Sequence, residues 1–308
     1  MSFKPVIKIP AISLSQEFEL EYCGDRDAWI GSPGSILTQD TNKILWAKNE
    51  ANLKKIKMGT VVVSELLKKH KNPGVNYLFT SHSPRLIFAK ILNKHFNDLG
   101  VSLSNDIQRH LEDPKIVVGD NSYIGHHVSI GSGTVIYPNV VIHNQTSIGC
   151  NCVIKSFTSI ASDGLGFENV DGELVKFPQI GGVIIGDEVE IGPNSTVRRA
   201  ALDNTIIRDG CKIGALSNIG HNCVIGENSI LTCQCVTGSS SILGNNVYMG
   251  INSIIKNGNI VGNNVKIGQG AVVTRDVPDN SIVVGNPAEP IENYKKWSTI
   301  RKKLLNEI

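Results

Sequence analysis

The chain has 308 residues, 41% of them hydrophobic and 19% charged, with a formal net charge of +2 at pH 7. This length exceeds that of a usual single core, so we expect about two domains. The small net charge gives no reason to expect a nucleic-acid partner. The sequence contains no run of about 18 apolar residues and no signal-peptide core, which argues against a transmembrane segment and against secretion. We expect a cytoplasmic protein.

The first region, residues 1–100, predicts a small α/β domain. A strand is expected at Gly59–Ser64, which reads Gly-Thr-Val-Val-Val-Ser. An amphipathic helix is expected at Ser83–Phe96, with Ser83 as its N-cap and Pro84 at its first position. Residues 101–115 then form a linker to the next domain.

Residues 116–285 carry a six-residue repeat. Every sixth residue from Val118 to Ile160 is aliphatic, and the pattern resumes at residues 185–197 and 207–273, where only Thr237 departs from it. A period of six is too short for a helical repeat and fits a parallel β-helix, in which three short strands make each coil of about 18 residues. The sequence therefore predicts a mainly β protein with a left-handed parallel β-helix.

A second inward position, four residues after each aliphatic residue, holds small or apolar side chains. Four of the seven cysteines fall there, where a free thiol is a compact apolar filler. No Cys-x-x-Cys motif or Cys/His cluster completes a zinc site, so we expect no metal. Glycine often follows the aliphatic residue directly, since a tight corner favours a residue without a Cβ. The inward cysteines are Cys152, Cys211, Cys223 and Cys235.

Two insertions interrupt the repeat, at residues 162–183 and 198–206. A solenoid tolerates insertions where a loop leaves a corner, commonly toward a binding face. We expect the larger insertion to form a hairpin that reaches an adjacent subunit, with Lys176, Phe177 and Gln179 among its contact residues. The alternative is that both loops are decorative.

Residues 286–308 form a tail that ends in a helix. Three prolines break the repeat, and residues 291–308 show helical periodicity. One face of this helix is apolar and the other is basic. The apolar face comprises Trp297, Ile300, Leu304 and Ile308.

A family resemblance is carried by the loops as well as by the repeats. The segments that carry it are residues 163–167 (Asp-Gly-Leu-Gly-Phe), 175–181 (Val-Lys-Phe-Pro-Gln-Ile-Gly), 184–192, 201–207 and 219–222 (Ile-Gly-His-Asn). Together these segments resemble UDP-3-O-acylglucosamine N-acyltransferase, the lipid A pathway enzyme, and residues 57–63 and 85–91 look like that family's uridine-binding module. The resemblance implies a homotrimer with active sites between neighbouring β-helices, a nucleotide-sugar substrate, and a histidine base at His221.

The sequence also departs from that family's pattern. Arg198, Arg199 and Ala200 stand where the family has Asp-Arg-Gly, and Gly214 and Ala215 stand where it has an Asp-Asn pair before the catalytic histidine. Loss of that acid bears on the substrate or on the details of proton transfer.

The uridine-binding module differs as well, because the tyrosine expected to stack on uracil is missing near Asn49. Trp46 is the aromatic side chain that could take this role. We therefore group Trp46 and Asn49 with residues of the larger insertion and of the histidine segment as substrate-binding candidates. The other candidates are Lys176, Phe177, Gln179 and Asn222.

The end of the repeat suggests an acyl donor. Residues 270–288 are similar to the closing segment of acetyl-CoA-dependent hexapeptide acetyltransferases, which borders coenzyme A in those relatives, so Asn286 and Pro287 are cofactor-binding candidates. Lys256, Arg275 and the basic C-terminal helix could hold the phosphates of coenzyme A or the acidic surface of an acyl carrier protein. A solvated helix face is an equal alternative.

His221 fits the chemistry of acyl transfer. A thioester is attacked by a neutral amine whose proton must be removed, a task suited to an imidazole that titrates near neutral pH. One coil further along the chain lies Ser239, about 4.8 Å away by strand spacing. The backbone N–H of Ser239 or of Gly238 is then a candidate oxyanion donor. The alternative is an exposed solenoid histidine with no role.

Three functions remain open. The favoured one is transfer of an acetyl group from acetyl-CoA to the amine of a nucleotide-linked amino sugar. The second is the lipid A reaction proper, with a 3-hydroxyacyl chain delivered by the phosphopantetheine arm of acyl carrier protein. The third is a non-catalytic trimeric scaffold. His126, His127 and His143 do not form the spaced three-histidine set of β-helical carbonic anhydrases.

Overall fold

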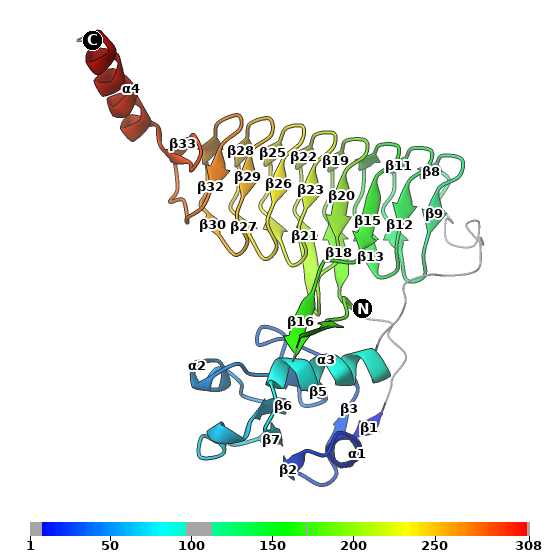
Figure 1. Ribbon diagram of the computed structural model, residues 1–308. Helices are drawn as coiled ribbons and strands as arrows, with labels where there is room; N and C mark the ends of the chain where they lie inside the picture. Colours follow the sequence, from blue (N-terminus) through cyan, green and yellow to red (C-terminus); the bar gives the residue numbers. More distant parts are fainter. Residues whose placement is uncertain (1–7, 97–112, 171, 307–308) are drawn as a thin grey trace. The chain divides into compact units, whose positions relative to one another are not determined.

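A computed structural model describes residues 8–96, 113–170 and 172–306. Most of the predicted linker 101–115 and Ile308 lie outside the described residues. The chain forms two compact units (Figure 1). The N-terminal unit comprises residues 1–99, 165–180 and 201–203, and the β-helix unit comprises residues 100–164, 181–200 and 204–308. Segments of both predicted insertions therefore belong to the N-terminal unit.

The N-terminal unit is built on a five-stranded sheet of order β2-β7-β6-β5-β4, in which only β2 runs antiparallel to its neighbour. The strand predicted at Gly59–Ser64 is β6, at the centre of the sheet. A separate pair, β1 and β3, is antiparallel. The strands are β1 (Ile9–Pro10), β2 (Glu21–Cys23), β3 (Trp29–Ile30), β4 (Ser32–Pro33), β5 (Lys43–Trp46), β6 (Gly59–Ser64) and β7 (Val75–Thr80). The helices are α1 (Ala11–Glu17), α2 (Glu50–Leu53), the 3₁₀ turn η1 (Glu65–Leu67) and α3 (Pro84–His95).

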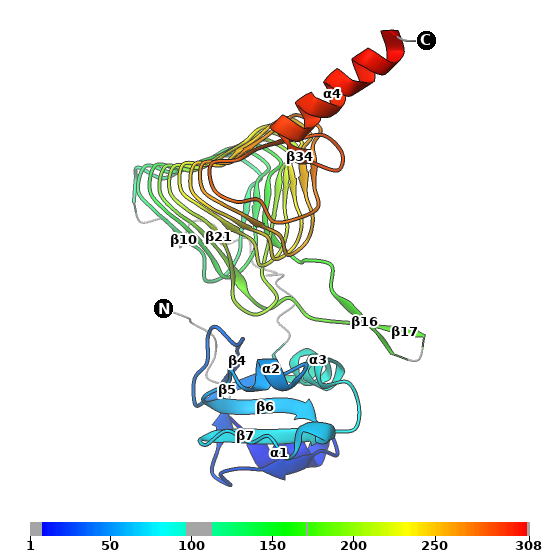
Figure 2. The same cartoon turned by 90° about the vertical axis from the view of Figure 1, so that its left-hand side faces the viewer.

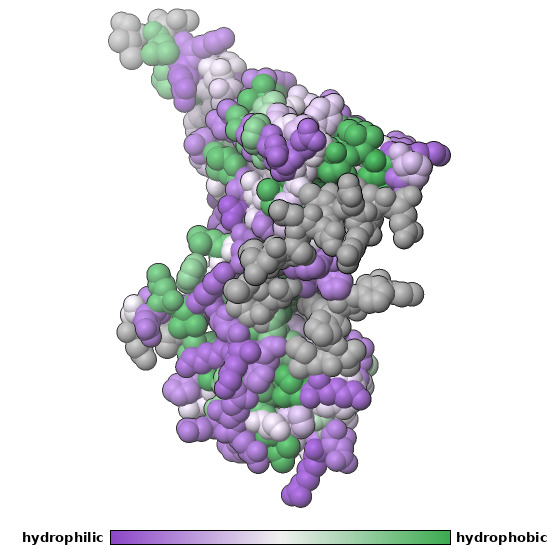
Figure 3. Space-filling view, turned by 90° about the vertical axis from the view of Figure 1, so that its right-hand side faces the viewer, coloured by the Kyte–Doolittle hydropathy of each residue, from purple (hydrophilic) through white to green (hydrophobic). Residues whose placement is uncertain are grey.

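The predicted helix of this unit is confirmed as α3. The Ser83 hydroxyl accepts a hydrogen bond from the N–H of Leu86 at 3.4 Å, and Pro84 occupies the first turn, where its missing N–H costs nothing. Phe88 and Leu92 are fully buried in the core between α3 and the sheet. In Figure 3 hydrophilic side chains cover most of this unit's visible face, as expected when its apolar residues fill its own core.

The larger insertion forms a hairpin, as predicted, but it contacts its own chain. Strand β16 (Phe167–Val170) pairs antiparallel with β17 (Glu173–Lys176). The side chain of Asn93 on α3 donates to the carbonyl of Lys176 at 2.9 Å, and Arg85 forms an ion pair with Glu168. The expectation that this loop reaches an adjacent subunit missed these contacts, because the apolar residues after β17 complete the core beneath α3.

The β-helix unit consists of three parallel sheets that enclose one apolar core, and its coils are three-sided when viewed along the axis (Figure 2). Sheet I contains β8 (Val117–Val118), β11 (Val135–Ile136), β14 (Val153–Ile154), β19 (Glu190–Ile191), β22 (Lys212–Ile213), β25 (Ile230–Leu231), β28 (Tyr248–Met249), β31 (Lys266–Ile267), β33 (Ile282–Val284) and the antiparallel β34 (Glu289–Pro290). Sheet II contains β9 (Tyr123–Ile124), β12 (Val141–Ile142), β15 (Ser159–Ser162), β20 (Thr196–Arg198), β23 (Asn218–Ile219), β26 (Val236–Thr237), β29 (Ile254–Ile255) and β32 (Val272–Val273). Sheet III contains β10 (Ser129–Ile130), β13 (Thr146–Ile148), β18 (Gly182–Ile185), β21 (Asn204–Ile207), β24 (Val224–Ile225), β27 (Ile242–Leu243) and β30 (Ile260–Val261).

The repeat positions behave as predicted. Equivalent residues of successive coils pair in register, as Ile219 pairs with Thr237, and the aliphatic residues Ile142 and Ile225 are fully buried. The four inward cysteines are buried too. Thr237, the one departure from the aliphatic column, is 1% exposed, and its hydroxyl accepts from the N–H of Gly220 at 3.2 Å. A polar side chain is tolerated at this position because it is hydrogen-bonded.

Asparagine residues form the corners of the coils, whereas the glycines allow successive coils to pack closely. The residue three after the aliphatic one takes left-handed φ values, with Asn121, Asn222 and Asn252 at 58°, 60° and 58°. Asparagine tolerates this region better than other non-glycine residues. At Gly192, which directly follows an aliphatic residue, an added Cβ would lie 2.5 Å from the backbone nitrogen of Ala215 in the next coil. The glycines therefore allow close packing of successive coils.

The C-terminal tail closes the last coil and then leaves it. The N–H of Val272 donates to the carbonyl of Gly285 at 2.9 Å, and the N–H of Ala288 donates to the carbonyl of Val272 at 2.6 Å. Helix α4 (Ile291–Asn306) follows, as predicted, and its side chains Trp297 and Leu304 are 60% and 58% exposed. Among the described residues, no helix has the length and apolarity to cross a membrane.

Candidate functional site

His221 lies at the corner that follows β23, where the chain passes from sheet II to sheet III. Its ring is half-buried. The side-chain amide nitrogen of Asn222 lies 2.7 Å from its Nδ1, and its backbone carbonyl accepts from the N–H of Ser240 at 2.8 Å. The corner therefore restrains both the backbone of His221 and the Nδ1 edge of its imidazole ring.

Asn222 is itself restrained by its backbone conformation and by two hydrogen bonds. Its backbone is left-handed, its N–H donates to the hydroxyl of Thr205 at 3.0 Å, and its amide nitrogen donates to the Ser240 hydroxyl at 3.4 Å. Thr205 is fully buried on β21, so this anchor is rigid. The sequence suggested Asn222 as a substrate ligand, whereas in the structure its side chain contacts His221 and Ser240.

Ser239 lies one coil beyond His221, because Ile219 pairs with Thr237 in the sheet register. The N–H groups that we predicted as oxyanion donors already have partners. The N–H of Ser239 donates to Oδ1 of Asn257 at 3.0 Å, and that of Gly238 donates to the carbonyl of Ile255 at 2.7 Å. Their oxyanion role stays a prediction that requires one of these bonds to break. The hydroxyl of Ser239 is the other donor that this residue offers.

The predicted donor-binding residues follow the same corner. Thr237 pairs with Ile255, and Ile255 pairs with Val273, so Lys256 and Arg275 lie two and three coils beyond His221, with Arg275 about 14 Å away at one strand spacing per coil. Both cations are exposed.

Asn286 and Pro287 lie in the closing segment whose flanking residues bond to Val272, at the end of this run of coils. Both residues are exposed. The four predicted donor-binding residues therefore lie on the C-terminal coils of the β-helix unit. Along the coils, Ser239 lies between them and His221.

The two arginines that depart from the family pattern have structural partners. Arg198 donates through Nη1 to the carbonyl of Asp163 at 3.1 Å and through Nε to Oδ1 of Asn218 at 3.4 Å. Arg199 is 1% exposed and donates through Nη2 to the carbonyl of Asn144 at 2.8 Å. They brace the base of the insertions. Sequence reasoning missed this role, because an Arg-Arg pair in a loop gives no signal of burial.

The substrate-binding candidates of the N-terminal unit are mostly part of its framework. Phe177 and Gln179 are 4% and 3% exposed, and half-buried Trp46 packs on the same core cluster as Phe177. The side chain of Asn49 caps α2 by accepting from the N–H of Asn52 at 3.0 Å. Only Lys176 is exposed among the insertion candidates. A direct substrate contact by Phe177 or Gln179 requires this core to open.

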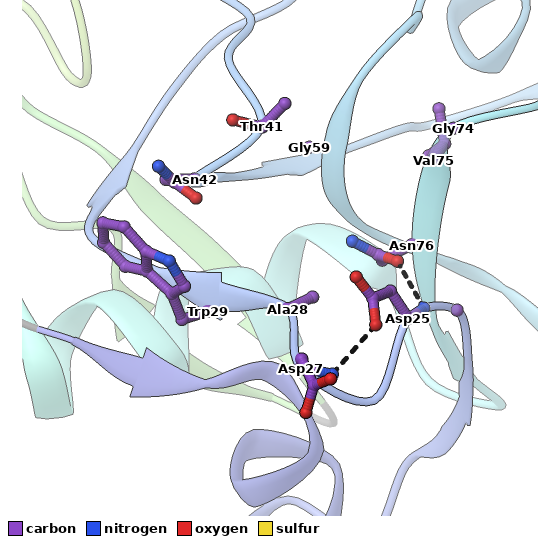
Figure 4. Close-up of a pocket in the computed structure, with 11 residues that line it drawn as sticks. Asp25, Asp27, Ala28, Trp29, Thr41, Asn42, Gly59, Gly74, Val75 and Asn76 are labelled. Carbon is purple, nitrogen blue, oxygen red and sulfur yellow. Dashed lines mark hydrogen bonds between the residues drawn. The ribbon is translucent and has the colours of Figure 1, made fainter.

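The N-terminal unit has a pocket of about 490 Å³ (Figure 4). The pocket opens where β6 and β7 begin, and Asp25, Asp27 and the indole of Trp29 form one wall. Trp46 ends β5, so it lies at the other end of the parallel strands. The carboxylate of Asp25 accepts from the N–H of Asp27 at 3.0 Å. Both aspartates are exposed, so the pocket is an open, acidic depression. No sequence pattern predicted this pocket, because its lining comes from four separate segments of the chain.

The buried thiols near the histidine are poor nucleophiles. Burial raises the pKa of the Cys211 thiol to about 11, and burial also raises the pKa of Cys223, two residues from His221. These thiols stay protonated at neutral pH and are weak nucleophiles. In the described part of the chain, no group of three His, Cys, Asp or Glu side chains could hold a metal ion. The site offers an imidazole, an amide, hydroxyl groups and exposed cations.

Comparisons with known proteins agree with this picture. The model of the GLGC left-handed parallel beta-helix domain matches residues 183–303. A UDP-3-O-acylglucosamine N-acyltransferase of Coxiella burnetii is 35% identical over 233 residues, which are 65% of this chain and 65% of that protein. One of Herminiimonas arsenicoxydans is 43% identical over 100 residues, 32% of this chain and 29% of that protein. The chain thus spans less than two thirds of these relatives.

Solved structures show the same fold. The UDP-N-acetylglucosamine O-acyltransferase of Moraxella catarrhalis superposes with a TM-score of 0.52 at 22% identity, covering 57% of this chain and 67% of that chain. At this identity the likeness concerns the fold alone. It agrees with the predicted left-handed β-helix, which the family model also confirms. The chain is a hexapeptide-repeat protein similar to the UDP-3-O-acylglucosamine N-acyltransferases, which confirms the resemblance found in its sequence.

Proposed function

We propose that the protein is an N-acyltransferase that moves an acyl group from a thioester to the amine of a UDP-linked amino sugar, with His221 as general base. The observation that carries the proposal is the held imidazole: Asn222 lies against Nδ1 at 2.7 Å, at a corner of the β-helix. The similarity to UDP-3-O-acylglucosamine N-acyltransferases extends over 65% of the chain and supports this reaction class.

The chemistry needs one base and one hydrogen-bond donor. The amine nitrogen attacks the thioester carbonyl carbon, and His221 takes the amine proton as the tetrahedral adduct forms and collapses. The C–S bond then breaks, and the proton passes to the leaving thiolate. The oxyanion needs a donor, and the Ser239 hydroxyl, one coil from His221, is the candidate in this chain that leaves the backbone ladder intact.

The acyl donor we propose is a 3-hydroxyacyl chain on acyl carrier protein, with a UDP-3-O-acylglucosamine as acceptor. The names of the relatives favour this reaction over the acetyl transfer that we preferred from the sequence. Lys256 and Arg275 can pair with the phosphate of a phosphopantetheine arm laid along the corner. The proposal includes a cytoplasmic location, where we expect these substrates to be found.

Acetyl-CoA remains the second candidate because of the closing segment. The bonds of Val272 to Gly285 and Ala288 fold residues 285–288 against the last coil, beside the position of Arg275. This arrangement offers Asn286 and Pro287 to a donor at the C-terminal end of the corner. A small acyl group delivered by coenzyme A would use the same His221.

A homotrimer forms part of the proposal, and sheet III supports it. Its outward positions carry an apolar side chain on five successive coils, of which Ile184, Ile242 and Ile260 are 40%, 45% and 51% exposed. A continuous apolar row of this kind is typical of a protein interface. The row is Ile184, Ile206, Val224, Ile242 and Ile260.

If the row forms the trimer interface, a charge within it should prevent assembly. The variant Ile242→Lys places a charge in the middle of the row, so we expect it to run as a monomer in size-exclusion chromatography with light scattering, because an unpaired buried charge is strongly unfavourable. Ile230→Lys, at an exposed outward position of sheet I, is the matched control and should stay trimeric. A monomeric wild type would remove the trimer from the proposal.

The function is tested by a crossed panel of donors and acceptors. The donors are 3-hydroxyacyl-acyl carrier proteins of several chain lengths and acetyl-CoA, and the acceptors are UDP-3-O-acylglucosamine and other UDP amino sugars. We expect amide formation from a 3-hydroxyacyl donor. Amide formation from acetyl-CoA alone would restore the acetyltransferase, and no transfer with any pair would favour the non-catalytic scaffold.

A further inference from the structure

We propose that α4 binds an anionic lipid surface, with its apolar side chains among the lipids and its cations at the headgroups. The starting observation is that α4 leaves large apolar side chains in water: Trp297, Leu304 and Leu305 are 60%, 58% and 66% exposed. Although α4 contacts β33 and β34, every side chain from Thr299 to Leu305 is exposed. The proposal stands on this helix and does not require the acyl-transfer reaction proposed above.

The apolar side chains form one stripe along the helix. They recur at spacings of three and four residues, which places them on one side of an α-helix. A helix of 16 residues is about 24 Å long, shorter than the roughly 30 Å of a bilayer's hydrocarbon core. α4 therefore fits an orientation along the lipid surface and not across it. We call this set the α4 stripe; its members are Tyr294, Trp297, Ile300 and Leu304, and Leu305 borders them.

The charge of α4 is strongly positive and complements anionic headgroups. The helix has five cations and one acid, Glu292, which lies 3.5 Å from Lys295. Each cation near an anionic membrane surface raises partitioning about fivefold. A helix that combines such cations with an aromatic and aliphatic stripe is typical of those that lie in the membrane interface. The cations are Lys295, Lys296, Arg301, Lys302 and Lys303.

The position of Arg301 favours a lipid surface over a bundle of α4 helices. Arg301 lies within the α4 stripe, four residues after Trp297 and three before Leu304. A bundle of copies would bury the stripe and this guanidinium with it, and an unpaired buried charge is strongly unfavourable. At a lipid surface the aliphatic part of the arginine can lie along the apolar region while its charged group reaches the headgroups.

A lipid surface also stabilises α4 better than water does. Isolated helices near this length are marginal in water, and most helical stability in proteins comes from the packing of an amphipathic face. Lipid would supply that packing to the α4 stripe. The same surface suits the proposed substrates, because an acylated sugar is an amphiphile that partitions to lipid. This last consequence alone rests on the proposed function.

Vesicle binding by the full-length protein tests the proposal. The vesicles consist of phosphatidylcholine alone or of phosphatidylcholine with phosphatidylglycerol, which is anionic. We expect the protein to sediment with the anionic vesicles, to bind phosphatidylcholine at least about tenfold more weakly, and to lose binding at high salt. Failure to bind anionic vesicles at low salt would overturn the proposal.

Paired charge variants test the role of the cations. Lys302→Gln with Lys303→Gln removes two positive charges, so partitioning to anionic vesicles should fall about 25-fold. Lys55→Gln with Lys69→Gln, two exposed lysines of the N-terminal unit, is the matched control and should bind as the wild type does. Equal losses in the two double variants would mean that net charge, and not α4, attracts the lipid.

A second pair of variants tests the apolar stripe. Trp297→Ser should weaken vesicle binding by about tenfold or more, because the indole no longer leaves water. Leu66→Ser, at a residue 86% exposed on η1, should bind as the wild type does. Wild-type vesicle binding by Trp297→Ser would show that the stripe does not enter the lipid.

Two other occupants of the stripe predict different results. If copies of α4 cover one another, Trp297→Ser lowers the oligomeric mass in light scattering and the wild type does not bind vesicles. If an acidic protein such as acyl carrier protein covers it, the wild type binds the carrier but not vesicles. Either result would overturn the lipid surface. His221→Ala should bind vesicles as the wild type does, so failure of the proposed function and failure of lipid binding are distinguishable.

Discussion

The β-helix unit and the N-terminal unit assemble their cores in different ways. In the β-helix each inward side chain meets its equivalents one coil before and one coil after, so the core is a set of local stacks. In the N-terminal unit the core gathers residues far apart in the chain, including Phe177 and Ile180 from the larger insertion. The insertion that interrupts the repeat of the β-helix unit thus completes the core of the N-terminal unit.

The largest expected effect tests the completed core. Phe177 lies with its ring 6.2 Å from that of Phe88, and the Arg85 guanidinium covers it at 5.1 Å. Phe177→Ala should lower the free energy of unfolding of the N-terminal unit by about 3–5 kcal/mol through the cavity it leaves. Tryptophan fluorescence in denaturant measures this in a Trp297→Phe background. Leu174→Ala, 67% exposed on the same hairpin, is the control.

One result would contradict this role of the insertion. If Phe177→Ala and Leu174→Ala unfold at the same denaturant concentration, the hairpin is an appendage and the N-terminal core is complete without it.

The next effect belongs to the β-helix. Ile213 is 3% exposed and pairs with Ile191 and Leu231 on the neighbouring coils. Ile213→Ala should cost about 2–5 kcal/mol and be seen in far-UV circular dichroism, while the fluorescence transition of the N-terminal unit stays in place. Ile230→Ala, 43% exposed on the same sheet, should change little. Coincident shifts of both transitions in Ile213→Ala would show that the two cores unfold together.

The smallest effect concerns the spacing between coils. In Gly192→Ala the new methyl group meets the Ala215 backbone at 2.5 Å, so successive coils must separate, at a cost of about 1–3 kcal/mol. Gly258→Asn is the matched control, because that glycine has a left-handed φ of 75° and open space around its Cβ position. Equal thermal stability of Gly192→Ala and wild type would mean that the glycines after the aliphatic residues do not set the distance between coils.

The β-helix was predictable because its constraint is periodic. A side chain such as Ile219 repeats every coil, so its column, its burial and its register with Thr237 follow from counting residues. Capping chemistry likewise located α3 at Ser83 and Pro84. By contrast, the burial of Phe177 and the core contact of the insertion depend on chain segments about 80 residues apart, which no local pattern records.

The site was predictable only in part, for the same reason. The position of His221 and its one-coil offset from Ser239 come from the repeat. The partners of their polar groups do not: Asn257 takes the N–H of Ser239, and Asn222 turns to the imidazole. Such choices among equally polar side chains depend on geometry within a few ångströms. The repeat therefore predicted where these residues lie on the coils, but not which partners their polar groups take.

The most direct test of the account is the acyl-transfer rate of His221→Ala with the best donor and acceptor, measured beside His126→Ala. His126 lies at the same corner of an early coil and is exposed, so it controls for loss of a corner histidine. We expect kcat to fall by about 10²–10⁴ in His221→Ala, as for loss of a general base, and to stay at the wild-type level in His126→Ala. Wild-type turnover by a folded His221→Ala protein would contradict the account.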